Sequence, residues 1–586
     1  MSTAWIQFVG SMERSIRMRV LWALLAIGVC GGIALWIEPS EAKFVVRHFG
    51  YYFTLLASLG CVLYGAQLLR AVDWGQFKFS RILPMLASVL IGCWVLFAQA
   101  DFGYKIAMDD YLLTQTAKSM HETREVARTE FGRPIGRDFV ALEVEVDKRP
   151  WLYPFAVASL HDLVGYRPVN PFVVNALAAV LFLAGAYGFG HLLAGRWAGV
   201  SAVLLWAGLP LLAQNATGAG MEMLNLLLLQ GVLLLAVYYL QRPTRAAEGA
   251  LSLMMVLLAY TRYESGLLIL PVALVIVVGW WRERRIVLSW GTVLAAPLLL
   301  GLLLQTQIYA VSESAWELNA EAASPFGVEA LLNNIPHALY FFFSYNHNLA
   351  NSLLVSLLGI PALLAFYVML RTELPKYWRS NPAGLVTSLF GLFLLLHLLF
   401  VLSFHASQFD SPYVSRYALP IHWILIFSLI ALLGYMAQRW PTIWRYVIGL
   451  AVIFILSFSL PMNSKAIFSR SNFLVNERNW LEELSEKGFE SSSLVVDRFF
   501  PSWALLEQAA LEPSVALLNS DRIRDEITTG KYPAVYLVER MEYRAGKFVP
   551  NLSELEQLRA LWSVELYAER SFRPFELTRV YRYAPE

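Results

Sequence analysis

Two adjacent carboxylates, Asp109 and Asp110, follow within ten residues of a long apolar run at 83–100. A carboxylate placed there could take a proton from a hydroxyl group as a general base, or bind a cation. The alternative is helix capping, because an Asp before a helix accepts hydrogen bonds from its first free N–H groups. The stretch AMDDYLLTQTAKSM could form such a helix along a membrane surface. A side-by-side pair is costlier than one cap, since each carboxylate disfavours ionisation of the other.

Four basic side chains could bind an anion near this pair. Lys148 and Arg149 end the segment 101–150, while Arg262 and Arg416 each stand where a later apolar run begins. Each alone could be an interfacial anchor, because long cationic side chains reach lipid phosphates. Three such sites from distant parts of the chain favour a convergent anion site, for which arginine offers a planar bidentate fork.

Further polar residues are candidates whose role the sequence leaves open. Glu222 stands at the start of an apolar run, where it is as plausible a cap as a ligand, and Glu264 lies with Arg262 in the turn between two runs. His347 and His405 are also candidates, and Asp410 follows closely. Residues this scattered define no metal ligand set, so no cofactor is expected and a divalent cation is left open. The chain contains no P-loop, HExxH, CxxC or GxSxG pattern.

Membrane-spanning helices must position these residues. Of the 586 residues, 57% are hydrophobic and 15% are charged, whereas soluble domains carry about 25% charged residues. Repeated apolar stretches of about 18 or more residues predict an all-α polytopic membrane bundle rather than an outer-membrane barrel. About thirteen spans are predicted, at 20–37, 49–69, 82–100, 171–194, 198–213, 223–240, 250–261, 266–281, 286–304, 350–370, 383–402, 417–437 and 443–461.

Arg and Lys in the short loops indicate how the spans are oriented. With the N-terminus in the cytoplasm, every short loop on that side carries positive charge. The opposite side then holds the segments 101–150, 305–349 and 403–416 and the C-terminal tail, so the function is sought there. The formal charge of +2 and the absence of a long basic patch do not suggest nucleic acid as a partner.

The composition becomes that of a soluble domain near residue 462. Short β-like runs such as SSLVVD and PAVYLVE alternate with helix-like runs such as PSWALLEQAAL, which predicts a small α/β domain outside the membrane. The predicted organisation is therefore two N-terminal transmembrane helices in 1–81, a transmembrane module in 82–461, and a soluble domain in 462–586.

The order of these motifs resembles that of the C-type membrane glycosyltransferases, most closely the branch of protein O-mannosyltransferases and lipid A aminoarabinose transferases. Asp109, Asp110 and Tyr111 stand like the Asp-Glu-aromatic motif of that family, and the segment from Arg149 to Tyr153 resembles its Lys-Pro-Pro-Leu-Tyr. Arg-Tyr-Glu at 262–264 and Arg-Tyr-x-x-Pro at 416–420 also resemble its outer-face segments. The chain departs from the pattern in having Asp110 for Glu and Arg149 for Lys. The resemblance covers about residues 82–461.

The resemblance implies an inverting glycosyltransferase of the bacterial inner membrane. It would move a sugar from a polyprenyl-phosphate donor to a hydroxyl or amine of a lipid, glycan or protein acceptor on the extracytoplasmic face. No nucleotide sugar is supplied there, which fits a lipid-linked donor. Asp109 would be the base, and Asp110 would orient the acceptor or hold Asp109. The candidates for neutralising the departing phosphate are Lys148, Arg149, Arg262 and Arg416.

Two rival functions share the lipid-linked substrate. A transporter or flippase of lipid-linked glycans would line its path with charged or broken segments near the middle of the spans. Such residues are scarce in this chain, and the nearest are Arg262 and Glu264. A polymerase or ligase of surface polysaccharide would differ mainly in its acceptor.

Overall fold

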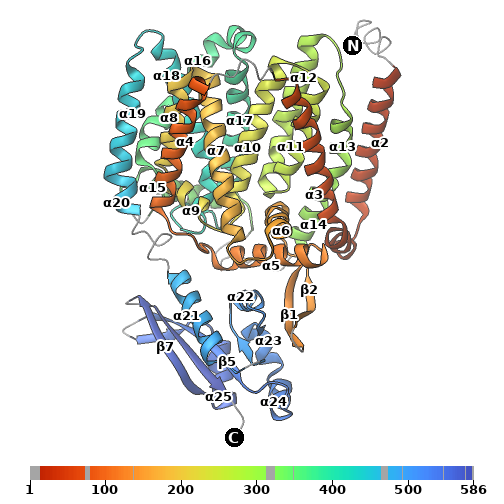
Figure 1. The fold of residues 1–586 in the computed structure, drawn as a ribbon, viewed down its shortest axis with the longest axis vertical. Coiled ribbons are helices and arrows are strands. Elements are labelled where there is room, and N and C mark those ends of the chain that lie inside the picture. The colour runs from red at the N-terminus through yellow and green to blue at the C-terminus, as the bar shows by residue number, and fades with distance from the viewer. Residues whose placement is uncertain are drawn as a thin grey trace.

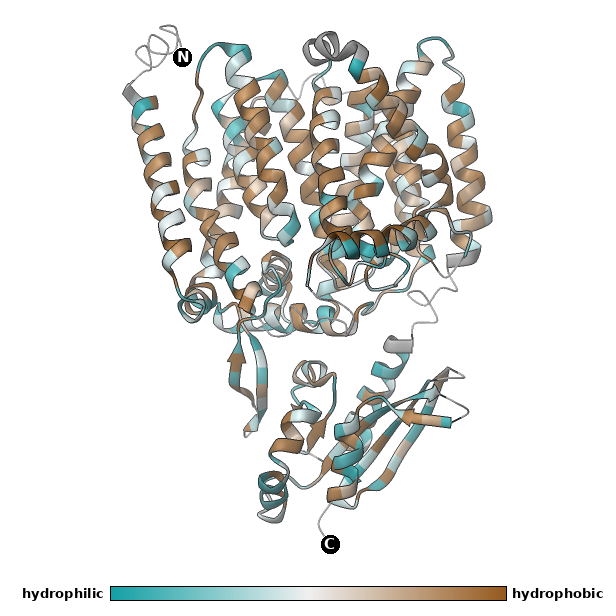
Figure 2. Cartoon of the chain, turned by 180° about the vertical axis from the view of Figure 1, so that it is seen from behind, coloured by the Kyte–Doolittle hydropathy of each residue, from teal (hydrophilic) through white to brown (hydrophobic). Residues whose placement is uncertain are grey.

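The computed structural model describes residues 14–72, 79–135, 138–311, 324–346, 349–463, 473–490, 492–544, 547–573 and 576–583. These residues form a helical bundle and a smaller α/β domain beyond one end of it (Figure 1). The bundle helices are mostly hydrophobic, while the smaller domain mixes hydrophobic and hydrophilic residues (Figure 2). The predicted fold class, a polytopic α-helical membrane protein with a small C-terminal α/β domain, is confirmed.

Ten helical stretches among the described residues are long and apolar enough to cross a membrane. Each coincides with a predicted span, because apolar runs of this length are the strongest signal in the sequence. The elements that form them are α2 (Arg14–Trp36), α3 (Pro39–Arg70), α4 (Phe79–Gln99), α7 (Asn170–Ala194), α10 (Glu222–Gln241), η2 with α12 (Tyr263–Leu268, Ile269–Glu283), α13 with α14 (Trp290–Leu298, Leu300–Val311), α16 (Leu353–Ser380), α17 (Pro382–Leu402), and η4 with α18 (Ser415–Ala418, Leu419–Ala437).

The other three predicted spans differ from long straight helices. The run 198–213 forms α8 (Arg196–Ala207) and α9 (Pro210–Ala216), which meet at a 75° bend. Gly208 ends α8, and Pro210 begins α9 without a backbone N–H. The runs 250–261 and 443–461 form shorter helices, α11 (Arg245–Ala259) and α19 (Ile443–Phe454) with η5 (Ile455–Ser459) and α20 (Leu460–Asn463). The described part of the chain therefore has ten candidate spans, or eleven with the bent pair, rather than about thirteen.

The two predicted outer loops contain regular structure. In 101–150 the chain forms α5 (Ala107–Thr123), which lies across the end of the bundle, and the antiparallel hairpin β1 (Arg128–Ile135) and β2 (Asp138–Glu145), which extends toward the C-terminal domain (Figure 1). The helix α6 (Leu152–Val164) follows and re-enters the bundle. In 305–349 the described residues form the end of α14 and a further helix, α15 (Val328–Phe343).

The C-terminal domain is built on one sheet, in the order β4-β3-β5-β8-β7, with β6 paired to β5. Strand β3 runs parallel to both of its neighbours, β4 and β5. Strand β8 runs antiparallel to both of its neighbours, β5 and β7. The predicted helix over PSWALLEQAAL is only partly correct, because Ala509–Leu511 pair with β3 as strand β4. The elements are α21 (Phe473–Gly488), β3 (Leu494–Val496), α22 (Phe500–Ala504), β4 (Ala509–Leu511), α23 (Pro513–Leu518), α24 (Ser520–Thr528), β5 (Val535–Arg544), β6 (Lys547–Pro550), α25 (Ser553–Trp562), β7 (Glu565–Arg573) and β8 (Glu576–Tyr583).

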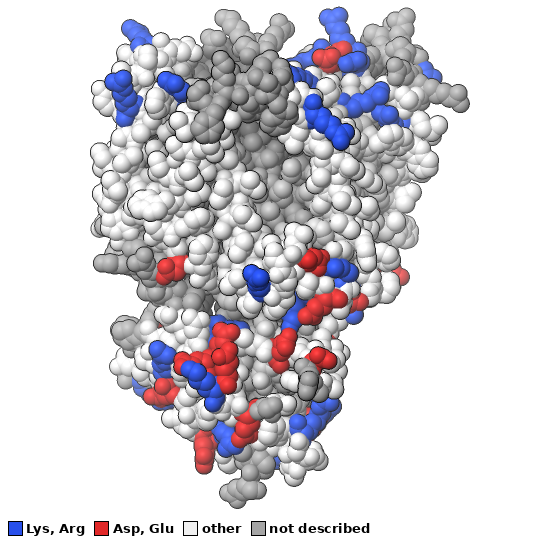
Figure 3. Space-filling model, in the orientation of Figure 1, with Lys and Arg blue, Asp and Glu red and all other residues white. Residues whose placement is uncertain are grey.

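The two ends of the bundle differ in charge. Lys and Arg side chains gather at the end that holds the N-terminus, while acidic and basic side chains mix at the other end and over the C-terminal domain (Figure 3). The C-terminal domain and α5 lie at the end away from the N-terminus (Figure 1). The segments that carry the candidate site therefore lie opposite the positively charged loops.

Candidate active site

The two adjacent carboxylates lie in the first turn of α5 and do different things. Asp110 turns back and accepts hydrogen bonds from the backbone N–H groups of Lys105 (2.7 Å) and Ile106 (3.1 Å). It thereby satisfies N–H groups just ahead of the helix, much as a capping residue does. Asp109 instead extends to two arginines, one from the segment before α6 and one from η4, just before α18.

Asp109 bridges Arg149 and Arg416. Its Oδ1 accepts bonds from Nε (2.8 Å) and Nη2 (2.5 Å) of Arg149, and its Oδ2 accepts one from Nη2 of Arg416. Burial alone would raise the pKa of Asp109, but these two guanidinium groups outweigh burial and hold the pKa well below its usual range. In this arrangement the carboxylate is firmly ionised and is a weak base.

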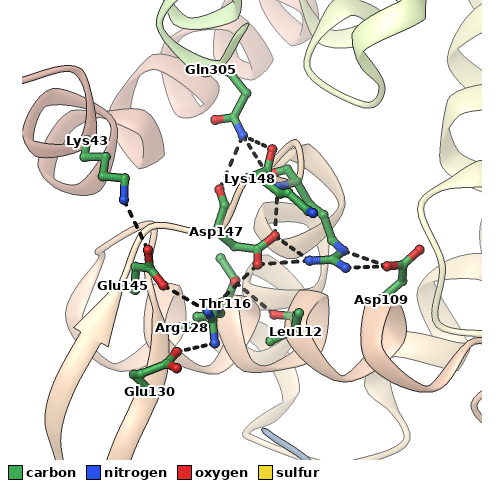
Figure 4. Close-up of polar contacts among 11 residues, drawn as sticks. Lys43, Asp109, Leu112, Thr116, Arg128, Glu130, Glu145, Asp147, Lys148 and Gln305 are labelled. Atoms are coloured by element: carbon green, nitrogen blue, oxygen red, sulfur yellow. Dashed lines mark hydrogen bonds and ion pairs between the residues drawn. The ribbon is translucent and has the colours of Figure 1, made fainter. Parts of the chain in front are cut away.

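The two arginines extend Asp109 into a longer chain of alternating charges. Arg149 also donates through Nη1 to both oxygens of Asp147, at 3.0 Å each. Figure 4 shows Asp147 and Asp109 on either side of this guanidinium, with Gln305 donating to the backbone oxygen of Lys148 nearby. Asp147 was not a predicted site residue, although it immediately precedes Lys148 in the sequence.

At the other end, Glu222 holds two arginines at once. Its Oε1 lies 2.6 Å from Nη1 of Arg262 and 3.1 Å from Nη1 of Arg416. Arg262 also donates to Oε1 of Glu264 through Nη2 at 2.7 Å, and its guanidinium carbon lies 4.5 Å from the centroid of the Tyr417 ring. We call the whole set the ion-pair chain; it runs through Asp147, Arg149, Asp109, Arg416, Glu222, Arg262 and Glu264.

Residues of the ion-pair chain stand at the starts of helices that meet at one end of the bundle. Glu222 is the first residue of α10, Arg262 directly precedes η2, and Arg416 lies in η4 just before α18. The backbone must pass close to Glu222, because a Cβ added at Gly220 would lie 2.4 Å from Oε2 of that carboxylate. The bent α8–α9 pair brings the chain to this glycine. A larger residue there would push the Glu222 carboxylate away from its position beside the two arginines.

A cavity of about 460 Å³ opens beside the ion-pair chain. One wall is charged and includes Asp109, Lys148, Arg149, Arg262, Glu264 and Arg416. A second part of the lining, the apolar wall, includes Phe326, Phe400 and Phe404, whose rings pack with centroids 5.0 Å (Phe326–Phe400) and 5.3 Å (Phe326–Phe404) apart. Such a cavity suits a ligand that carries an anionic group and an apolar chain.

Asp110 faces a second and much smaller space of about 20 Å³, also lined by Lys105, Glu222 and Arg416. This volume is close to that of a single bound water. Burial raises the pKa of Asp110 to about 7, and the nearby Glu222 carboxylate adds to the rise against the two backbone hydrogen bonds. The two neighbouring carboxylates thus have pKa values pushed in opposite directions, which often marks a division of roles.

The remaining predicted site residues lie elsewhere. Tyr111 contacts the C-terminal domain, with its ring centroid 6.4 Å from that of Phe499. Tyr153 is buried and donates to the carbonyl oxygen of Pro171 at 2.9 Å. His405 packs against Phe404 with ring centroids 4.6 Å apart, and His347 lies outside the described residues. The side chain of Asp410 pairs with His337.

A metal site does not form from the acidic and histidine side chains that the structure describes. Within that part of the chain, no group of three or more His, Cys, Asp or Glu residues could hold a metal ion. The arrangement instead offers an anion three guanidinium groups, each already paired with carboxylates, and the Lys148 side chain.

The bundle and the charged cavity at its end define a polytopic membrane protein with the fold of the C-type glycosyltransferases, as the motif order predicted. The fold is similar to the crystal structure of ArnT from Cupriavidus metallidurans in the apo state, with a TM-score of 0.50 and 13% identity over 84% of this chain and 97% of that one.

Two further structures resemble the chain less closely. They are the same ArnT bound to undecaprenyl phosphate (TM-score 0.48, 12% identity, 86% of this chain and 98% of that one) and the apo oligosaccharyltransferase of Archaeoglobus fulgidus (0.42, 10%, 82% and 75%). No protein-family model and no curated protein matches the sequence. At these identities the similarity concerns the fold alone.

Proposed function

We propose that this protein transfers a sugar from a polyprenyl-phosphate donor to an acceptor hydroxyl or amine at the extracytoplasmic face of the bacterial inner membrane. The observation that carries the proposal is the position of Asp109, which lines the 460 Å³ cavity while held between Arg149 and Arg416. The charged wall of the cavity suits a phosphate, and the apolar wall suits the first units of a lipid chain.

In the proposed reaction the donor phosphate replaces Asp109 as the partner of the two arginines. Asp109 is the best placed carboxylate of the ion-pair chain to be displaced, since its side chain is 17% exposed against 3% for Glu222. Both arginines would keep a second carboxylate, Asp147 for Arg149 and Glu222 for Arg416. Loss of two positive neighbours raises the pKa of Asp109 toward the range of a useful base.

The released carboxylate then takes the proton of the acceptor hydroxyl while the acceptor oxygen attacks the anomeric carbon. The bond from that carbon to the donor phosphate oxygen breaks, and polyprenyl phosphate leaves with the electron pair. The guanidinium groups of Arg149 and Arg416 and the ammonium of Lys148 offset the charge that grows on the phosphate. One displacement of this kind inverts the anomeric centre.

The location of the charges favours an enzyme over a transporter. The buried charges of the ion-pair chain stand at helix starts at one end of the bundle, beside α5. A transport path would carry them near the middle of the spans.

The test uses purified protein in detergent with a panel of polyprenyl-phosphate sugars and acceptors, and follows the release of free polyprenyl phosphate. We expect turnover with one donor and a loss of about 10² or more in Asp109→Asn. Asp410→Asn is the matched control, because Asp410 is a paired carboxylate that does not line the cavity. Turnover by Asp109→Asn at the rate of the wild type, or no turnover of any donor, would contradict the proposal.

A further inference from the structure

A third cavity, of about 360 Å³, lies where α5, the β1–β2 hairpin and the C-terminal domain meet. The second half of α5 supplies Gln115 and Ser119, the hairpin supplies Thr129, Phe139 and Leu142, and the C-terminal domain closes the cavity with Ala504 of α22. None of these residues belongs to the ion-pair chain. The volume is at the lower end of the range of small-ligand pockets, roughly 300–1,000 Å³.

The C-terminal domain is fastened to α5 at this junction. Tyr111, Gln115 and Lys118 are spaced four and three residues apart, so they share one face of the helix. Gln115 donates to the carbonyl oxygen of Pro501 (2.6 Å), and Lys118 pairs with Glu507 (2.9 Å). These contacts hold the C-terminal domain where Ala504 completes the cavity lining.

The charged groups of the cavity wall neutralise one another. Arg47 lies 2.8 Å from Glu125, and Lys118 lies 3.8 Å from Glu122 in addition to its contact with Glu507. Each basic side chain thus has at least one carboxylate partner. A phosphate or another anion would have to break these pairs, so the wall fits an uncharged ligand better.

The uncharged groups suit a ligand with hydroxyl groups on one side and C–H groups on the other. Gln115, Ser119 and Thr129 bring one amide and two hydroxyl groups to the lining of the cavity. Phe139 and Leu142 bring apolar side chains to the same lining. A pyranose ring has this combination of an apolar face and a polar edge.

We propose that this cavity binds an uncharged sugar unit of a carbohydrate chain. Gln115 lies six residues after Asp109 on α5, which is about 9 Å along the helix axis. Six residues also turn the helix by about 600°, so Gln115 projects about 120° away from Asp109, and a sugar chain that reaches both must pass around α5. Its assignment to the acceptor rests on the proposed function, whereas carbohydrate binding itself does not.

The test is direct binding, without turnover. The full-length protein in detergent is applied to an array of uncharged and anionic oligosaccharides, and the best ligand is then titrated by calorimetry. We expect an uncharged oligosaccharide to bind, and Phe139→Ala to weaken it by about tenfold or more through lost apolar contact. Val140→Ala is the matched control, because this neighbour on β2 is 37% exposed and does not line the cavity.

Ser119→Ala, which removes one hydroxyl from the cavity lining, provides a second variant if Phe139→Ala lowers the melting temperature. The proposal fails if no uncharged glycan binds, if both cavity variants bind like the wild type, or if Val140→Ala weakens binding equally. Glycan binding by a protein that turns over no lipid-linked donor would keep this proposal and overturn the proposed function. Donor turnover without glycan binding would overturn this proposal and leave the proposed function standing.

Discussion

Removing the charge of Asp109 should tighten the binding of polyprenyl phosphate while it abolishes transfer. In the proposed reaction the phosphate competes with Asp109 for Arg149 and Arg416, which both contact this carboxylate directly. A hydrogen bond to a charged group contributes about 1.5–3 kcal/mol net. Binding of the phosphate to the wild type must break about one such bond between Asp109 and an arginine, which Asp109→Asn weakens in advance. Because about 1.4 kcal/mol corresponds to a tenfold change in affinity, Asp109→Asn should bind polyprenyl phosphate about 10- to 100-fold more tightly.

The assay is a titration of the purified variant with undecaprenyl phosphate, read by calorimetry and by thermal melting in detergent. The variant should melt lower than the wild type without ligand, because two buried guanidinium groups lose their shared partner, and the lipid phosphate should restore much of that loss. The control Asp410→Asn should leave the affinity for undecaprenyl phosphate unchanged and should lower the melting temperature less than Asp109→Asn does. Equal or weaker binding by Asp109→Asn would refute the displacement, whatever its effect on turnover.

Three further outcomes follow from the contacts. Glu222→Gln should destabilise the protein by about 3–5 kcal/mol, because it removes a buried partner of two arginines; unchanged thermal melting would argue against this. Because the pKa of Asp110 is raised in the folded protein, its charged form opposes folding. The free energy of unfolding should therefore fall as the pH rises from about 4 to about 7. The stability gain of Asp110→Asn over the wild type should accordingly grow between about pH 4 and pH 7, by at most about 1.4 kcal/mol per pH unit, and then level off; a constant difference between pH 4 and pH 7 would count against the shift. Tyr111→Ala should speed hydrogen exchange of the Phe500–Ala504 amides, because Tyr111 packs against this part of the C-terminal domain; exchange like that of the wild type would show that the contact does not secure the docking.

Two features could be predicted from the sequence: the membrane spans, and the gathering on one face of charged residues that are far apart in the chain. The two predictions depend on different signals. Span prediction depends on apolar run length, which each long helix satisfies alone. The count was too high where the helices are short or where Gly208 and Pro210 bend the chain. Arg149, Arg262 and Arg416 could be assigned to one face because alternation of spans determines the side on which each turn lies.

The pairing within the site could not be predicted in the same way. Nothing in the sequence indicates that one oxygen of Glu222 serves both Arg262 and Arg416, because that depends on how the starts of three helices meet. Tyr111 follows the Asp pair directly, which predicts that it belongs to the same motif. A helix turns about 100° per residue, so Tyr111 projects from a different face than its neighbour Asp109 and meets the C-terminal domain.

The balance of charge in the ion-pair chain bears on which ligands can use the site. Four carboxylates accompany three guanidinium groups, so this set of buried charges has no excess of positive charge before a ligand arrives. An inorganic phosphate must displace a carboxylate and gains only the charged wall, with the Lys148 side chain, in return. A lipid phosphate displaces the same carboxylate and also places its chain against the apolar wall of Phe326, Phe400 and Phe404. Displacing a carboxylate costs binding free energy for any phosphate. Contact of the lipid chain with the apolar wall would offset that cost for a lipid-linked phosphate. In the proposed reaction the same displacement would free Asp109, so the base would become active only with the donor in place and the site would be protected from reaction without a donor.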